Sequence, residues 1–383
     1  MTGRFYFDFR DVFRAGRMGF KGKKMLMHFL GLMLGYVIYE ILTYVSLINS
    51  DVIGNFWRFY GLCPVFLISW KSSIILPLPT IIMMVIGAII WLIIYLLFNT
   101  AVSKVVIEEL RGDDFYSMRS AFKFASKNAK SIYVTILGLI GIFIFCLLLP
   151  SLVGIIDLIP KIELAAKHFG TPLTAFLTIL VYFLGLFMVL TIIACLFGLL
   201  LIPAIVAATG EDTFETIYQL YSTIWNQPWR LFIYNKLIWF ITILGFSVFA
   251  VISVCGLYMA YLPSMVLAKQ DTFYFADIIA KALKVINAGY LIPMIPGASS
   301  VINPMPWTLD LATFFLFVSF IMIVAIVISY PLSIMSSGYT IIYVVLRKKT
   351  TNENMLEPIK EEPTKEQAAQ SEEQKTEEST ENK

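Results

Sequence analysis

Long stretches without a charged residue are the feature that most constrains this chain. Four of them contain no Asp, Glu, Lys or Arg: Ser72–Ser103, Ile132–Ile156, Leu237–Ala268 and Leu311–Leu346. A helix of about 20 apolar residues is long enough to cross the hydrocarbon core of a bilayer. Each stretch exceeds that length, so the sequence predicts an integral membrane protein made of helices.

The composition agrees with this reading. Hydrophobic residues make up 58% of the 383 residues and charged residues only 14%, with a mean hydropathy of +0.80. Such values are typical of polytopic membrane proteins and exclude most soluble domains of this length. The predicted fold class is therefore all-α, a polytopic transmembrane helix bundle.

Apolar runs bounded by polar segments predict six spans, at residues 25–48, 74–99, 132–157, 172–207, 232–260 and 312–346. The first follows a long basic segment without a small-residue cleavage site, so we expect an uncleaved span and not a signal peptide. The fourth and sixth exceed one straight crossing. Pro203 and Pro331 are their expected kink points.

The distribution of Lys and Arg predicts the orientation. With the N-terminus inside, the inner segments hold 18 Lys and Arg and the outer segments hold 7. Inner loops of membrane proteins carry this excess of positive charge. We therefore expect a multi-pass protein of the plasma (inner) membrane with both termini cytoplasmic. The same bias accounts for the basic charge of residues 1–349 without a nucleic-acid partner.

The last 34 residues differ from the rest of the chain. Residues 350–383 contain ten Glu and four Lys and almost no large apolar side chain after Ile359. A segment of this kind cannot bury enough apolar surface to order itself. The chain is thus expected to consist of an integral membrane domain, 1–349, and a disordered acidic tail, 350–383.

Short amphipathic segments before the spans resemble one another. Arg111-Gly112-Asp113-Asp114 aligns with Thr209-Gly210-Glu211-Asp212 at an offset of 98, and an apolar stripe at helical spacing follows each. The first stripe consists of Met118, Ala121, Phe122, Ala125 and Ala129, and the second of Phe214, Ile217, Tyr221 and Ile224. The basic segment containing Phe5, Phe9, Val12, Phe13, Gly16 and Phe20 fits the same plan. We therefore predict three repeats, at 1–99, 100–208 and 209–346, with amphipathic helices at the cytoplasmic interface. The outer insert of the third repeat, 269–311, is expected to cap the bundle or to act as a gate.

Glu40 is the best candidate for an intramembrane polar site, since it lies about two-thirds of the way along the first span. An unpaired charge in hydrocarbon costs several kcal/mol, so such residues often mark ion or proton pathways. The alternative is that Glu40 snorkels or hydrogen-bonds to a neighbouring helix. In the same span, Gly31 and Gly35 form a small-xxx-small pair that would allow close helix packing.

Motifs for chemistry are missing from the sequence. We find no nucleophile elbow, phosphate-binding glycine loop or HExxH motif, and the two His residues, His28 and His168, are too far apart to suggest a zinc site. Interfacial positions are expected for both. No catalytic residue, metal site or cofactor is predicted, and the chain is expected not to be an enzyme.

One family resemblance can be stated. Pro331-Leu332, Tyr343-Val344-Val345-Leu346-Arg347 and Glu109-Leu110-Arg111-Gly112 resemble a pattern in largely uncharacterised prokaryotic multi-pass membrane proteins, including the membrane domain of some glycerophosphodiester phosphodiesterases. The soluble catalytic barrel of those enzymes is absent, so the resemblance implies only a bacterial-type membrane module.

Two functions remain open at this point. The first is a scaffold or accessory subunit that lies in the lipid bilayer and binds a membrane-protein partner or a second copy of itself. The second is a small-solute or lipid transporter, which the repeats and Glu40 favour.

Overall fold

The computed structural model describes residues 5–60, 62, 76–156, 176, 178–267 and 307–357. Within these residues the regular structure is entirely helical. Residues 268–306, which include most of the outer insert, and residues 358–383 of the acidic tail lie outside the described part, as do His168 and Cys63.

In the described part of the chain six helices are long and apolar enough to cross a membrane, which confirms the all-α polytopic fold class. They are α3 (Gly22–Leu47), α5 (Leu78–Arg111), α7 (Ala129–Ile156), α10 (Thr178–Thr209), α12 (Pro228–Leu267) and α14 (Trp307–Thr351). The helices α10 and α14 continue through Pro203 and Pro331.

One boundary differs from the sequence prediction by about three turns of helix. The second span was expected to end at residue 99, but α5 continues to Arg111. No glycine or proline interrupts the segment after residue 99, and Val102, Val106 and Ile107 keep a buried face. The helix ends where Gly112 adopts a left-handed conformation with φ of 104°, which glycine accepts without strain.

Short helices precede the long ones. These are α1 (Phe9–Val12) and α2 (Arg14–Gly19) before α3, α6 (Met118–Lys127) before α7, and α11 (Thr213–Asn226) before α12, with α4 (Ile53–Tyr60) between α3 and α5. Side-chain caps begin three of them: Asp8 for α1, Ser117 for α6 and Asp212 for α11. This order is compatible with the three repeats, which stay a prediction.

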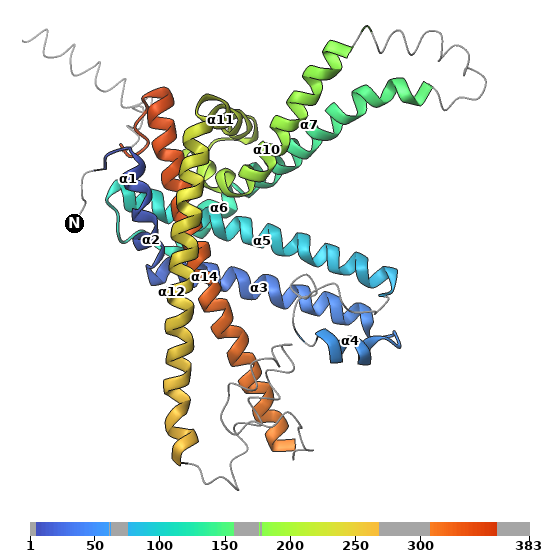
Figure 1. Cartoon of the computed structure of the whole chain (residues 1–383), viewed down its shortest axis with the longest axis vertical. Coiled ribbons are helices and arrows are strands. Elements are labelled where there is room, and N and C mark those ends of the chain that lie inside the picture. Colours follow the sequence, from blue (N-terminus) through green and yellow to red (C-terminus); the bar gives the residue numbers. More distant parts are fainter. Residues whose placement is uncertain are drawn as a thin grey trace, which may run out of the picture.

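The long helices pack as three pairs, α3 with α5, α7 with α10 and α12 with α14. Figure 1 shows that the pairs share one region, next to α2, α6 and α11, and diverge from it. The largest apolar core lies in that region, where the C-terminal parts of α5, α10 and α14 meet. Val106, Ile205 and Tyr343 are completely buried there.

The parts of the helices that point away from this core expose large apolar side chains. Phe183 on α10 and Ile243 and Val251 on α12 are examples. An apolar surface this extensive is unfavourable in water but suits contact with lipid chains or with other membrane helices. The fold therefore fixes the helices at one end and leaves their apolar lengths available to the membrane.

The amphipathic segments bury only part of the predicted stripes, since Val12, Ala121, Ala125 and Ile224 are buried as expected but several of the predicted rings are exposed. In α1–α2 the buried apolar side chains are Val12, Ala15 and Met18, next to the buried Asp11 and Gly19, whereas Phe9 and Phe13 are exposed. In α11, Phe214 was expected on the buried stripe but is 79% exposed. The small and aliphatic residues fit against the neighbouring helices, and the bulky rings remain outside because the close approach leaves no room for them.

Candidate functional site

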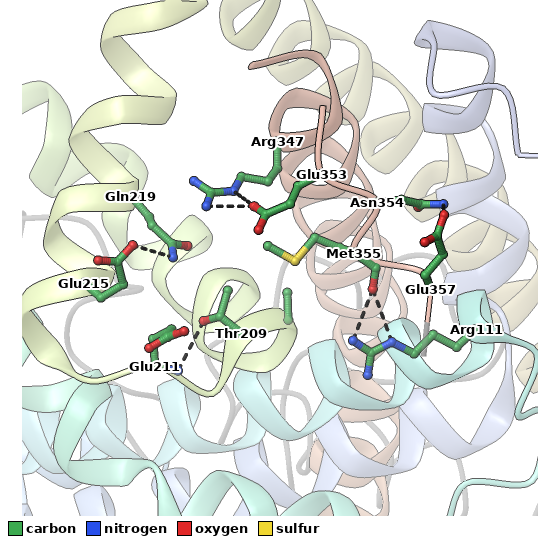
Figure 2. Close-up of a pocket in the computed structure, with 11 residues that line it drawn as sticks. Arg111, Thr209, Glu211, Glu215, Gln219, Arg347, Glu353, Asn354, Met355 and Glu357 are labelled. Atoms are coloured by element: carbon green, nitrogen blue, oxygen red, sulfur yellow. Dashed lines mark hydrogen bonds and ion pairs between the residues drawn. The ribbon is translucent and has the colours of Figure 1, made fainter. Parts of the chain in front are cut away.

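A pocket of about 690 Å³ lies where the ends of α5, α10 and α14 meet α11. Its lining residues are mostly polar (Figure 2): Arg111, Ala208, Thr209, Glu211, Glu215, Gln219, Arg347, Glu353, Asn354, Met355 and Glu357. Its size is within the range of pockets that hold small molecules or partner side chains. Each of the three helix pairs thus contributes the end of one helix, α5, α10 or α14, to the pocket.

The segment 352–357 closes one side of the pocket. Asn352 has a positive φ of 59° and turns the chain back after α14. The Nη2 of Arg347 then lies 2.9 Å from Oε2 of Glu353, and Nη2 of Arg111 donates to the carbonyl oxygen of Met355 at 3.1 Å. Met355 and Leu356 also pack against the main core. Two arginines from different helices therefore hold this segment over the pocket.

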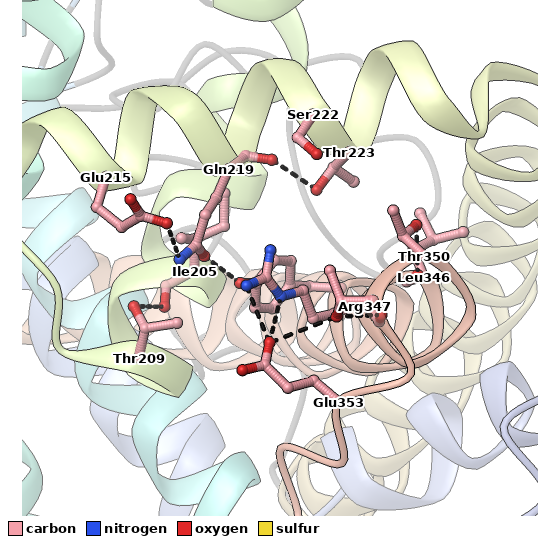
Figure 3. Close-up of polar contacts among 12 residues, drawn as sticks. Ile205, Thr209, Glu215, Gln219, Ser222, Thr223, Leu346, Arg347, Thr350 and Glu353 are labelled. Carbon is pink, nitrogen blue, oxygen red and sulfur yellow. Dashed lines mark hydrogen bonds and ion pairs between the residues drawn. The ribbon is translucent and has the colours of Figure 1, made fainter.

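The opposite side of the pocket is held by a buried polar chain (Figure 3). Gln219 on α11 donates from Nε2 to Oε1 of Glu215 at 2.9 Å, and its Oε1 accepts from the hydroxyl of Tyr343 on α14. Both Gln219 and Tyr343 are buried. The amide of Gln219 is thereby fixed in one orientation, and it positions the carboxylate of Glu215 toward the pocket.

The pocket carries more negative than positive charge, since four glutamates and two arginines line it. Arg347 pairs with Glu353, and Arg111 pairs with Glu108 at 3.0 Å. Glu211, Glu215 and Glu357 have no cationic partner among the described residues. No group of three His, Cys, Asp or Glu side chains in the described part of the chain has the arrangement of a metal site.

A cluster of ion pairs joins the start of α3 to the end of α5. Lys24 is fully buried and its Nζ lies 2.8 Å from Oε2 of Glu109, while Lys21 pairs with Glu109 at 2.8 Å and with Asp114 at 3.0 Å. Burial lowers the pKa of Lys21, but the hydrogen bonds and charges of Glu109 and Asp114 outweigh it, so its pKa is raised. The hydrogen bond from Lys21 lowers the pKa of Asp114.

His28 lies in the interior instead of at the interface, where the sequence predicted it. Its Nε2 is 2.8 Å from Oγ of Ser336, and the contact ties α3 to α14. The prediction relied on the position of His28 near the start of an apolar run, and it missed that α14 passes across this end of α3. Asn99 on α5 and Ser333 and Ser337 on α14 are also buried, without a side-chain hydrogen-bond partner among the described residues.

Gly31 and Gly35 both face α5. A Cβ atom on Gly31 would lie 2.8 Å from Cγ of Phe98, and one on Gly35 would lie 2.0 Å from Cδ1 of Trp91. Both distances are shorter than a carbon contact allows. The two glycines therefore let the rings of α5 approach the backbone of α3 within the same helix pair.

Glu40 lies on the same helix but away from the pocket. It is 8% exposed, and its Oε1 has no hydrogen-bond partner among the described residues. Gly31 and Gly35 share the face of α3 that packs on α5, and neither these glycines nor Glu40 lines the pocket.

The pocket residues were not predicted from the sequence as a site. Arg111, Thr209 and Glu211 appeared in the repeat alignment, Arg111 and Arg347 appeared in the motifs of the family resemblance, and Glu353 and Glu357 were assigned to the tail. The usable signal was that Arg347 comes directly after the uncharged run Leu311–Leu346, and that Arg111 belongs to the short charged segment that follows the run Ser72–Ser103. Charged residues at such ends can meet wherever the helices converge.

No protein-family model, curated protein or solved structure matches this chain. The resemblance to prokaryotic multi-pass proteins remains a prediction, and function must be argued from the site.

Proposed function

We propose that this protein is a non-enzymatic membrane scaffold or accessory subunit, and that its polar pocket is the docking point for a partner protein. The observation that supports this is the position of the pocket. It lies at the ends of α5, α10 and α14 and beside the short helix α11, instead of among the middle residues of the long helices.

The course of the long helices favours the same function. Transporters often bind their substrate where two spans are interrupted near the middle of the bilayer. Here α10 and α14 continue as helices through Pro203 and Pro331. A rigid inner junction with three diverging helix pairs suits a protein that holds partners in place.

The first experiment places a photo-crosslinking amino acid at Asn354, on the pocket rim, and separately at Leu244, an exposed apolar position on α12. In intact cells, a scaffold should give one protein adduct of defined mass from Asn354, and Glu215→Lys should abolish it. The control at Leu244 should not give that adduct. If Asn354 yields no protein adduct and the purified chain runs alone in mild detergent, the scaffold proposal is wrong.

A small-solute or lipid transporter is the second candidate. Buried polar side chains on α3, α5 and α14 favour it, namely Glu40, Asn99, Ser333 and Ser337, each with a side-chain atom that lacks a partner among the described residues. Polar groups between spans are usual on substrate or proton pathways. Flux of a solute or lipid through proteoliposomes that contain only this chain would decide for this function.

A further inference from the structure

The segment formed by α1 and α2 presents three distinct faces. Phe13, between the two helices, has right-handed helical angles, φ of −63° and ψ of −24°, so residues 9–19 follow one nearly continuous helical course. At about 100° per residue, Val12, Ala15 and Met18 fall on one side. This side is buried against α12 and α14: a Cβ on Gly19 would lie 2.8 Å from Cα of Ile334.

A second face is aromatic and exposed. Phe9 is 46% exposed and Phe13 is 52% exposed, and the two are four residues apart, so they lie one above the other on the helix surface. Phe20 continues the face and packs edge-on against the rings of Phe249 and Tyr330. Phe9 and Phe13 are thus large apolar side chains that the described helices leave uncovered.

A third face, next to the aromatic one, is cationic. Arg10 and Arg17 are seven residues apart, both are exposed, and neither forms an ion pair with another described residue. Arg14 differs, because its Nε lies 3.2 Å from the buried carboxylate of Asp11. Arg10, whose guanidinium carbon lies 6.0 Å from the centroid of the Phe9 ring, and Arg17 are therefore the guanidinium groups of this segment that have no ion-pair partner among the described residues.

We propose that the face formed by Phe9, Phe13, Arg10 and Arg17 binds the headgroups of anionic phospholipids. The helix α3 begins at Gly22, two residues after Phe20, so the face lies at the boundary of a predicted span. A phenylalanine strip beside a row of arginines matches the boundary between acyl chains and headgroups. Guanidinium groups bind phosphate through two parallel hydrogen bonds, and they favour an anionic headgroup over a zwitterionic one because no choline cation offsets the negative charge of its phosphate. This inference does not depend on the proposed function.

The test uses the full chain, purified in a neutral detergent, with short-chain phosphatidylglycerol or short-chain phosphatidylcholine as the probe. Binding is measured by native mass spectrometry and by the shift in melting temperature. We expect phosphatidylglycerol to bind more tightly, and Arg10→Gln with Arg17→Gln to weaken it by about fivefold for each arginine. Binding of phosphatidylcholine should change little. Inorganic phosphate should not produce the shift, because it has no acyl chain for Phe9 and Phe13.

The matched control is Lys123→Gln with Lys127→Gln on α6, which removes the same charge from two exposed positions. It should keep the preference for phosphatidylglycerol. Arg10→Lys with Arg17→Lys should keep part of the preference, which also shows that the segment folds when both arginines are replaced. If the glutamine pair retains the full preference, or the control loses as much of it, the proposal is wrong.

Discussion

Lys24, fully buried near the start of α3, has its Nζ 2.8 Å from Oε2 of Glu109 near the end of α5. The other oxygen of the same carboxylate, Oε1, lies 2.8 Å from Nζ of Lys21. A buried charge that loses its partner is far more costly than an exposed one. This contact therefore locks the two ends of the first helix pair together.

Removing one member of this pair should destabilise the protein strongly. We expect Glu109→Ala to lower the free energy of unfolding by about 3 kcal/mol, because the buried Lys24 would lose its partner and would have to carry an unpaired charge or give up its proton. The double variant Lys24→Met with Glu109→Leu should recover most of that loss, since it removes both charges and keeps the volume. Thermal unfolding in detergent measures the three variants. Equal stability of the single and double variants would contradict a buried charge as the cause.

Close packing at Gly35 gives a second prediction. Gly35→Ala places a methyl group against the ring of Trp91, and overpacking of this kind costs about 1–3 kcal/mol. Gly141→Ala is the matched control, because it lies in α7 with nothing within 4 Å of its Cβ position. The control should leave the melting temperature unchanged or raise it, since alanine favours helix over glycine. A silent Gly35→Ala would mean that α3 and α5 do not approach as closely as described.

A substitution at Glu40 should distinguish between the two candidate functions. For a scaffold, Glu40→Gln should be nearly silent, because the amide keeps the volume and removes the need to bury a charge. For an ion-coupled transporter, it should abolish function at normal protein level. The measurements are membrane abundance and a cellular phenotype of the deletion strain. If Glu40→Gln is present in the membrane at normal abundance but no longer rescues the deletion strain, this result counts against the scaffold.

The contact between Lys21 and Asp114 should depend on pH in a defined direction. The pKa of Asp114 is lowered by Lys21, so its stabilising effect is present above its ordinary pKa of 3.8 and is lost as the pH falls through the lowered value. The pKa of Lys21 is raised, so its contribution is complete below 10.5 and is lost as the pH rises beyond it.

Asp114→Asn should therefore lower the melting temperature at neutral pH and have a shrinking effect below about pH 4. Asp113→Asn is a suitable comparison, because Asp113 accepts only the amide of Phe115 and forms no ion pair with a described residue. High salt should reduce the effect of Asp114→Asn, since the contact is exposed. A difference that stays constant down to pH 2 would rule out this ion pair as its source.

The sequence predicted the long helices well because uncharged runs of bilayer length have few alternatives. Gly112 and Gly210, which hold the same position in the two aligned segments, both adopt a left-handed conformation, with φ of 104° and 70°. The sequence could not place the C-terminal end of α5, because residues 100–107 mix polar and apolar side chains and resemble a loop when their neighbours are unknown. These residues continue the helix because they are buried where α5 packs against α10.

The pocket could not be predicted for a related reason. Gln219 and Tyr343 are 124 residues apart, and no local pattern indicates that their side chains meet. Hydrophobic periodicity gives the face of a helix but not the partner of that face. Glu40, Gly31 and Gly35 could be selected as candidates from the sequence, because the features that mark them, a charge and a glycine spacing, lie within a single helix.

The hydrogen bond between His28 and Ser336 joins residues that are 308 positions apart in the chain. Membrane proteins are made from the N-terminus, so α3 exists long before α14 does. During that interval the imidazole of the first span has not met its native partner. The final packing of α3 must therefore wait for the last long helix, and a ribosome stalled before residue 336 would leave the first helix pair inserted but incompletely locked.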